Sequence, residues 1–294
     1  MRNIDKKKLP NVTTYLRYPG GKSRYIKRYI IDFIPDEFNR FIEPFAGGAS
    51  VSIFFKKLFS NNTFWINDID YNLYCFWMSL RDNTEDLYNK VKFYKDTYHN
   101  GNRKELFKKL KSEINNYDNI IDIAVAYYVL NKTSFSGLTQ QGNFTPLAWD
   151  SNFSYNNIEK LRKGNEYLKD IYITNKDYSS ILEDVYDGDF IFLDPPYDID
   201  KFLYGNNGEN HRNFDHYKFN RLIKKTNKEK DFKFLITYND NEVLRDMYKE
   251  FYIYDREFNY VMNFGKEKKG NKKNEIFITN FSIENNEDKP KRWF

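Results

Sequence analysis

An acid followed by two prolines and a tyrosine could act on the exocyclic amino group of a planar base. Asp194-Pro195-Pro196-Tyr197 follows the apolar run 190–193, which is typical of a strand buried on both faces. The prolines must end that strand, because proline has no N–H to donate within a sheet. Asp194 offers a carboxylate, Pro195 a carbonyl and Tyr197 an aromatic face. The alternative interpretation is a Pro-Pro turn followed by a core tyrosine.

Two glycine turns upstream are suited to a nucleoside-like cofactor. Residues 18–22 (Tyr-Pro-Gly-Gly-Lys) place a cation beside a flexible turn, although a plain capping turn has the same pattern. Residues 43–48 (Glu-Pro-Phe-Ala-Gly-Gly) lie between a predicted strand and a predicted helix, where glycine lets a ligand approach the backbone. The next strand ends at Asp68, 21 residues after Gly47, a spacing at which an acid accepts both hydroxyls of a ribose. No G-x-G-x-x-G or P-loop pattern is present, which disfavours a dinucleotide or a nucleoside triphosphate.

Alternating strands and helices are expected to position these residues. The alternation runs through residues 14–74 and resumes over 171–282. It predicts an α/β fold with a mostly parallel sheet, whose ligands bind at the carboxyl ends of the strands. Residues 75–170 interrupt the alternation and are predicted to form a helical insertion, with helices at 83–98, 103–116 and 119–131. Residues 1–13 and 283–294 are predicted to be flexible tails.

The sequence also predicts several shorter helices and strands. The helical spacing of Ile26, Ile30 and Phe33 predicts a helix that follows the first glycine turn and ends at Pro35. Later in the chain the pattern predicts helices at 216–229 and 241–250 and strands at 251–258 and 274–282.

Three loops carry polar or basic residues. Residues 131–146 form a loop that is long for a compact domain and holds aromatic and amide side chains, which is typical of a functional loop; a plain surface loop is the alternative. Residues 198–215 are rich in Asn and Gly, contain His211 and Arg212, and could act as a lid. The third loop is basic and either contacts phosphate or is merely solvated; its lysines are Lys266, Lys268, Lys269, Lys272 and Lys273.

Composition narrows the class of protein. The chain has 294 residues and a net charge of +5, and residues 1–30 hold nine Lys or Arg against one acid, a block that either attracts a phosphate backbone or forms a solvated tail. The single cysteine, Cys75, excludes an internal disulfide and indicates a reducing compartment. Cysteine and the scattered histidines (His99, His211, His216) form no zinc pattern, so no metal is expected. No apolar stretch has the length of a signal peptide or a membrane span, so a cytoplasmic protein is expected.

Taken in order, these segments resemble the Dam-like DNA adenine-N6 methyltransferases of the D12 class, the α group of amino-methyltransferases. The order is Tyr-Pro-Gly-Gly-Lys, Glu-Pro-Phe-Ala-Gly-Gly, the strand-ending Asp68, a helical insertion and Asp-Pro-Pro-Tyr, and the resemblance covers roughly residues 14–282. It implies a Rossmann-like S-adenosylmethionine methyltransferase sheet that acts on double-stranded DNA. It also implies that the insertion at 75–170 recognises the target site.

The resemblance assigns roles to residues of this chain. The catalytic tetrapeptide is Asp194, Pro195, Pro196 and Tyr197. S-Adenosylmethionine is expected at Tyr18, Gly21, Lys22, Phe45, Ala46, Gly47, Asp68, Asp177, Tyr178 and Asp194. DNA is expected at Phe135, Ser136, Gly137, Leu138, Gln140, Gln141, Asn143 and Pro146, with phosphate contacts from Lys268, Lys269, Lys272 and Lys273. Ser136 replaces an asparagine of the family's aromatic-Asn-Gly-Leu element, and the arginines of GATC-reading members are absent at Thr139 and Gln140, so the target sequence stays open.

These observations predict a site-specific DNA methyltransferase for the N6 amino group of adenine, which works alone or as the partner of a restriction endonuclease. The adenine is expected to flip out of the duplex, because its amino group is otherwise paired. Asp194 and the Pro195 carbonyl would each accept one N6 hydrogen, and Tyr197 would stack on the base. Two alternatives stay open: an amino-methyltransferase for RNA or protein amides, and a catalytically silent DNA-binding subunit. Asp at position 194 and the early insertion favour DNA, and the intact Lys22, Asp68 and Asp194 favour an enzyme.

Overall fold

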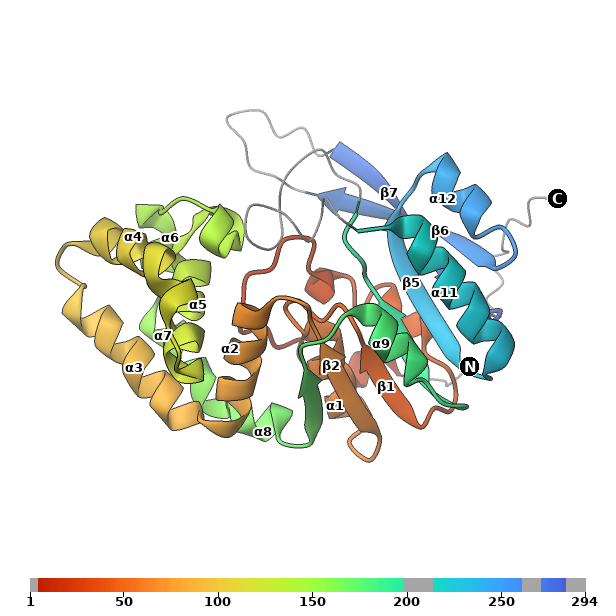
Figure 1. Ribbon diagram of the computed structural model, residues 1–294, viewed down its shortest axis with the longest axis horizontal. Helices are drawn as coiled ribbons and strands as arrows, with labels where there is room; N and C mark the ends of the chain where they lie inside the picture. Colours follow the sequence, from red (N-terminus) through yellow and green to blue (C-terminus); the bar gives the residue numbers. More distant parts are fainter. Residues whose placement is uncertain (1–4, 198–213, 261–270, 284–294) are drawn as a thin grey trace.

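A mostly parallel sheet of seven strands forms the centre of the described part of the chain (Figure 1). The computed structural model describes residues 5–197, 214–260 and 271–283. The strand order is β3-β2-β1-β4-β5-β7-β6; the first five strands run parallel, and β7 is antiparallel to both of its neighbours. The strands are β1 (Arg40–Glu43), β2 (Thr63–Asn67), β3 (Ile171–Thr174), β4 (Phe190–Leu193), β5 (Lys233–Asn239), β6 (Tyr252–Tyr260) and β7 (Asn271–Thr279).

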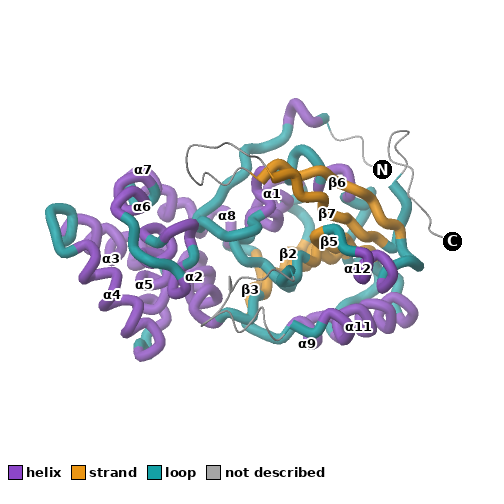
Figure 2. The backbone as a smooth tube through the Cα atoms, turned by 90° about the horizontal axis from the view of Figure 1, so that it is seen from above, coloured by secondary structure: helices purple, strands orange, loops and turns teal. Residues whose placement is uncertain are grey.

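Alternating side chains bury both faces of this sheet. In β4, Phe190 and Phe192 join one apolar cluster, whereas Ile191 and Leu193 join the other. Figure 2 shows helices on either side of the sheet: α1 (Ser50–Leu58) covers the first face, and α9 (Tyr178–Glu183), α11 (His216–Glu229) and α12 (Glu242–Met247) lie on the second. A strand covered on both faces needs apolar residues at every position, which explains the uninterrupted apolar run before Asp194.

The helices between β2 and β3 extend the molecule to one side of the sheet (Figure 1). Apolar packing is continuous across this junction, because Trp77, Tyr128 and Phe153 belong to the same cluster as Phe41 and Phe190 of the sheet. The inserted helices therefore share one core with the sheet. They are α2 (Tyr71–Asp82), α3 (Thr84–Thr97), α4 (Arg103–Glu113), α5 (Ile120–Thr133), α6 (Pro146–Ser151), α7 (Tyr155–Glu159) and α8 (Gly164–Leu168). In the residues that the structure describes, no helix combines the length and apolar character that a membrane crossing needs.

The predicted helices of the insertion and the predicted parallel sheet are both present in the structure. The three helices expected in the insertion are present as α3, α4 and α5, and the two expected late helices as α11 and α12. The mostly parallel sheet is confirmed, and its last two strands are β6 and β7.

The prediction of a helix directly after Lys22 is wrong. Two short 3-10 turns, Lys22–Arg24 and Ile30–Phe33, take its place. The backbone hydrogen bonds of this segment have no constant spacing: the Tyr29 amide donates to Tyr25, the Ile31 amide to Ile26 and the Asp32 amide to Tyr29, whereas an α-helix keeps a spacing of four residues. The buried residues are Tyr25, Ile26, Ile30, Ile31, Phe33 and Ile34. The segment therefore packs as an irregular strap across the sheet.

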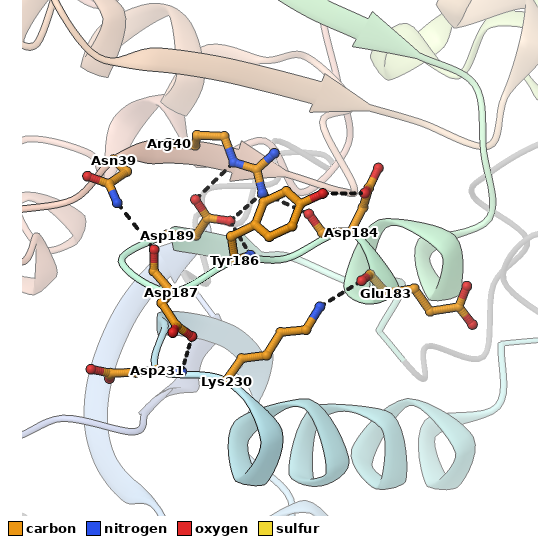
Figure 3. A network of polar contacts seen from close by, with 9 residues as sticks. All are labelled: Asn39, Arg40, Glu183, Asp184, Tyr186, Asp187, Asp189, Lys230 and Asp231. Atoms are coloured by element: carbon orange, nitrogen blue, oxygen red, sulfur yellow. Dashed lines mark hydrogen bonds and ion pairs between the residues drawn. The ribbon is translucent and has the colours of Figure 1, made fainter.

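A network of polar contacts ties the amino ends of the parallel strands together (Figure 3). Arg40, which begins β1, donates from Nε and Nη2 to the two carboxylate oxygens of Asp189, at 2.9 and 2.5 Å. Asp189 also accepts from the Tyr186 amide at 2.8 Å, and the Arg40 guanidinium lies 4.6 Å from the centre of the Tyr186 ring. The Asp231 amide, just before β5, donates to the Asp187 carboxylate at 2.8 Å. These contacts align β1, β4 and β5 at the end of the sheet opposite to their carboxyl ends.

We predict that Asp189→Asn lowers the free energy of unfolding by about 2–4 kcal/mol, because loss of one partner leaves a poorly solvated charge uncompensated. Urea unfolding measures the change. The control is Glu85→Gln, which removes the partner of Arg162 in an exposed ion pair and should cost less than about 1 kcal/mol. Equal losses in the two variants would show that the Asp189 network contributes no more than a surface pair.

Candidate functional site

A cleft opens at the carboxyl ends of β1, β2 and β4. The space inside and at the mouth of the cleft amounts to about 770 Å³, a volume that includes open solvent. Ligands of open α/β sheets bind at this edge. Most of the predicted catalytic and cofactor-binding residues meet along the cleft, namely Tyr18, Gly21, Lys22, Phe45, Ala46, Gly47, Asp68, Asp194, Pro195, Pro196 and Tyr197.

Asp177 and Tyr178 are not among the residues that line this cleft. The Asp177 carboxylate accepts from the Ser179 amide at 3.0 Å and caps α9. Tyr178 packs its ring against that of Phe45, with the ring centres 5.5 Å apart. It therefore supports one wall of the cleft from behind, and the direct contact of these two residues with a cofactor stays a prediction.

The Asp194 carboxylate is held by donors from three separate segments. Lys22 Nζ donates to Oδ1 and Oδ2 at 2.8 and 2.9 Å. Oδ1 also accepts from Thr237 Oγ1 at 2.7 Å and from the Tyr197 hydroxyl at 2.8 Å. Among the described residues, Oδ2 accepts from Lys22 alone. A carboxylate oxygen can accept more than one hydrogen bond, so Oδ2 keeps acceptor capacity for a ligand.

Lys22 is almost completely buried, with 2% of its side chain exposed. Burial alone lowers the pKa of Lys22, but the charges of Asp194 and Glu275 act against it, and the net shift is upward. The ammonium group also lies 4.8 Å from the centre of the Tyr197 ring. Lys22 is therefore a permanent cation that joins the first glycine turn to the end of β4.

Asp68 stabilises the second glycine turn. Its Oδ2 atom accepts from the Gly47 amide at 2.9 Å, and its Oδ1 atom accepts from the Asp70 amide at 3.0 Å. Desolvation and the neighbouring Asp70 carboxylate raise the pKa of Asp68 to about 7. Gly47 has a φ of +47°, and a Cβ atom there would lie 2.6 Å from the Tyr18 ring, so only glycine fits both its conformation and its packing.

Three further residues of the site were not predicted from the sequence: Glu43, Thr237 and Glu275. Glu43 lines the cleft, and its Oε2 atom accepts from both the amide and the hydroxyl of Ser52. Burial raises the pKa of Glu43 to about 8, although the Ser52 hydrogen bonds oppose the shift. The signal available for Glu43 was its place at the end of a strand, directly before the second glycine turn.

The recognition loop, defined here as residues 134–145, is joined to the first glycine turn by Asn131. This fully buried side chain accepts from the Arg17 amide at 2.9 Å and donates to the Arg17 carbonyl at 2.8 Å. It also donates to the Gly137 carbonyl at 3.1 Å. A side chain at Gly137 would collide with the Arg17 carbonyl. The recognition loop and the first glycine turn are therefore packed directly together.

The recognition loop is compact rather than extended, and the preceding residues 131–133 belong to α5. It contains two 3-10 turns, Phe135–Gly137 and Thr139–Gln141, with positive φ at Ser136, Gly137 and Thr139. Of its predicted DNA-binding residues, Phe135, Ser136 and Asn143 are exposed, as is the adjacent Pro146.

Gln140 is committed to contacts within the protein. Its Oε1 atom accepts from Asn72 and its Nε2 atom donates to Asn115, both at 3.2 Å. The Gln140 amide therefore braces the recognition loop against the helices of the insertion, which reduces its freedom to read a base.

Lys132 lies under the recognition loop at the end of α5 and is only 6% exposed. Its ammonium group lies 5.3 Å from the centre of the Tyr128 ring, and no carboxylate among the described residues pairs with it. Desolvation, followed by the charges of Lys160 and Arg17, lowers the pKa of Lys132 to about 7. A buried cation repelled by two others favours an anion beside it.

The predicted basic loop falls only partly within the described residues. Lys272 and Lys273 belong to β7, where they pair with Asn259 and Phe258 of β6, so this loop is shorter than predicted. Lys266, Lys268 and Lys269, and the predicted lid with His211 and Arg212, lie outside the described residues. Over residues 5–197, 214–260 and 271–283, no group of three or more His, Cys, Asp or Glu is arranged to hold a metal ion.

Comparison with known proteins yields a family match and several relatives. Residues 18–262 match the model of the D12 class N6 adenine-specific DNA methyltransferases. The chain is 26% identical to the Type II methyltransferase M.CviBI of Paramecium bursaria Chlorella virus NC1A, over 85% of this chain and 93% of that protein. It is 27% identical to the Type II methyltransferase M1.LlaDCHI of Lactococcus lactis subsp. cremoris, over 95% of this chain and 99% of that protein.

A solved structure also aligns with most of the chain. It is a precorrin-6y C5,15-methyltransferase from Geobacter metallireducens GS-15, with a TM-score of 0.39 and 11% identity over 94% of this chain and 95% of that one. This likeness is too distant to carry an argument.

Proposed function

Because the chain belongs to the D12 class N6 adenine-specific DNA methyltransferase family, we propose that it methylates an adenine flipped out of a short duplex site. The family and its relatives make the chain an S-adenosylmethionine-dependent DNA adenine methyltransferase. The flipped base and the roles of individual residues are our proposal. The observation that supports them best is the Asp194 carboxylate, which is fixed at the cleft by Lys22 and Thr237 and keeps acceptor capacity on Oδ2.

Asp194 and Pro195 are proposed to orient the target amine. Oδ2 of Asp194 would accept one N6 hydrogen and the Pro195 carbonyl the other, which directs the nitrogen lone pair away from both acceptors. The nitrogen gains a methyl group and loses one proton, so positive charge builds on it before the proton leaves. A fixed carboxylate and carbonyl stabilise that charge. The ring of Tyr197 would stack on the extruded base.

The cleft has groups suited to S-adenosylmethionine, which supplies a methyl group carried on a positively charged sulfur. The Asp68 oxygens each accept one backbone amide and each can accept one ribose hydroxyl in addition. Tyr18 and Phe45 provide aromatic walls of the cleft. Gly47, where a Cβ would clash with Tyr18, lets the backbone come close to a ligand. These residues, with Gly21 and Ala46, are our proposed cofactor site.

The recognition loop and Lys132 are proposed to contact DNA. Amide and hydroxyl groups read base edges, whereas cations contact the phosphates that position the duplex. The exposed Ser136 and Asn143 are therefore proposed to read bases, and the exposed Phe135 to brace the space that the adenine leaves. Lys132 is proposed to bind a phosphate, because an anion would lower the free-energy cost of a buried charge that Arg17 also repels.

A restriction endonuclease is a proposed functional partner. The support is that two relatives of nearly full length carry the name Type II methyltransferase. A nuclease gene beside the gene for this chain, whose product cuts only unmethylated DNA at the same site, would establish the pairing.

We predict that Asp194→Ala abolishes methyl transfer while duplex binding persists, because the carboxylate orients the amine and does not hold the DNA backbone. Transfer of labelled methyl groups is measured in parallel on mixed-sequence DNA, RNA and protein, and duplex binding by anisotropy. Labelling of RNA or protein but not of DNA by the wild type would replace the DNA proposal. Near wild-type turnover of Asp194→Ala would remove Asp194 from the mechanism.

We predict that cofactor affinity falls as the pH drops through about 7. Below that pH the free enzyme holds a proton on Asp68, and this proton must leave before both oxygens can accept ribose hydroxyls. Asp68→Asn should remove this pH dependence and weaken binding by about 1–3 kcal/mol. Calorimetry on both sides of that pH provides the measurement. Unchanged affinity and an unchanged pH profile in a folded Asp68→Asn protein would place the ribose elsewhere.

We predict that Lys132→Met stabilises the free protein and weakens binding of every duplex. Between pH 7 and the ordinary lysine pKa, the unfolded chain binds a proton that the folded protein lacks, so stability should rise with pH there, and the substitution should remove this slope. Phosphate favours the charged lysine, so duplex affinity should fall as the pH rises above about 7.

Thermal unfolding and anisotropy at fixed salt test the role of Lys132. Lys95→Met is the matched control, since Lys95 is also buried with a lowered pKa but packs beside Trp149 and Phe153. It should leave duplex affinity unchanged. Ser136→Gly should change the ranking of duplexes that differ by one base pair instead of weakening all of them equally. A Lys132→Met protein that binds DNA like the wild type would exclude the phosphate contact.

A further inference from the structure

Glu275 is a carboxylate buried beneath the candidate catalytic residues. It lies in β7 and has no exposed surface. The Tyr197 hydroxyl lies 3.4 Å from Glu275 Oε2 and can donate to it. The negative charges of Asp194 and Glu275 together stabilise the buried ammonium of Lys22. Glu275 thus adjoins two residues that hold Asp194, although it does not line the cleft.

The register of the sheet explains why Glu275 faces the site. Glu275 pairs with Asn239 of β5, and Phe277 pairs with Thr237. Directly opposed side chains of antiparallel strands share a face, as do residues two apart along one strand. Glu275, Phe277 and Thr237 therefore project to the same side. Phe277 packs in the apolar cluster that also contains Tyr25, so this is the side on which the strap behind Lys22 lies.

We propose that Glu275 is a positioning residue for methyl transfer, which acts through the Tyr197 hydroxyl and the Lys22 ammonium to fix the Asp194 carboxylate and the stacking ring. The inference rests on the proposed function of Asp194 and Tyr197. Tyr197 has one hydroxyl hydrogen, which lies between Asp194 at 2.8 Å and Glu275 at 3.4 Å. The shorter distance favours donation to Asp194, and the Glu275 oxygen limits the positions that the phenol group and its ring can take.

The charge of Glu275 has a separate effect on Lys22. The Lys22 cation offsets the negative charge of Asp194. The second negative charge, on Glu275, partly cancels this effect of Lys22 on Asp194. Asp194 therefore stays a stronger acceptor for the developing charge on the target nitrogen. Arg256 stands opposite Glu275 in the register of β6.

Two substitutions separate the two effects. Glu275→Gln keeps an acceptor oxygen for the Tyr197 hydroxyl and removes the charge, whereas Glu275→Ala removes both. The single-turnover rate constant is measured with excess enzyme, saturating S-adenosylmethionine and long unmethylated DNA of mixed sequence, which makes it insensitive to a fraction of unfolded enzyme. We expect a fall of about 10-fold for Gln and about 100-fold for Ala. The dissociation constants for S-adenosylmethionine and for DNA should stay within about threefold, since neither ligand contacts Glu275.

A double-mutant cycle with Tyr197→Phe tests the route of the effect. If Glu275 acts through the Tyr197 hydroxyl, Glu275→Ala should cost less in the Phe background than in the wild type. The matched control, Asp189→Asn, removes another buried acid at the opposite end of the sheet and should leave the rate constant unchanged. Three results would overturn the positioning role. The rate constants could be unchanged in both Glu275 variants, the losses could be confined to the dissociation constants, or the effects in the cycle could be additive. Absence of methyl transfer to DNA by the wild type would overturn the proposed function itself.

Discussion

The buried ion pair between Lys22 and Asp194 is the contact on which the site depends. Its partners are 172 residues apart in the chain, and an ammonium group this deeply buried is tolerated only next to negative charge. The pair therefore forces the first glycine turn onto the end of β4. With the turn in place, Tyr18 packs over Gly47, and Gly47 in turn donates its amide to Asp68. One electrostatic requirement thus connects Asp194, at the end of β4, with Asp68, at the end of β2.

The acids at the strand ends act as a group. Glu43, Asp68 and Asp194 follow or end three adjacent parallel strands, and all three line the cleft. The charges of Asp194 and Asp68 contribute to the raised pKa of Glu43, after the larger effect of burial. Burial raises the pKa of Glu43 to about 8 and that of Asp68 to about 7, so both hold protons readily near neutral pH. Lys22 balances the charge of Asp194, and the three acids can therefore lie close together without a large net negative charge.

Glu43 ends a strand but was not assigned to the site from the sequence, whereas Asp68 and Asp194 were predictable because each follows the apolar run of a strand. Thr237 and Glu275 were not, because they reach the site through the sheet order β4-β5-β7, which a single sequence does not encode locally. The signal in the sequence for Glu275 was its position as an acid directly before the apolar run 276–278. The strap behind Lys22 was predicted as a helix because Ile26, Ile30 and Phe33 have helical spacing; this spacing does not report whether the backbone hydrogen bonds are regular.

Asn131 joins the recognition loop to the first glycine turn through main-chain groups, the amide and carbonyl of Arg17 and the carbonyl of Gly137. The Arg17 guanidinium adds a second link, because its Nη1 atom donates to the Ser134 carbonyl at 3.3 Å. Loss of the Asn131 amide would leave buried main-chain groups of both segments without a partner. The position of the loop is therefore inherited from the glycine turn, and a displacement of one segment displaces the other.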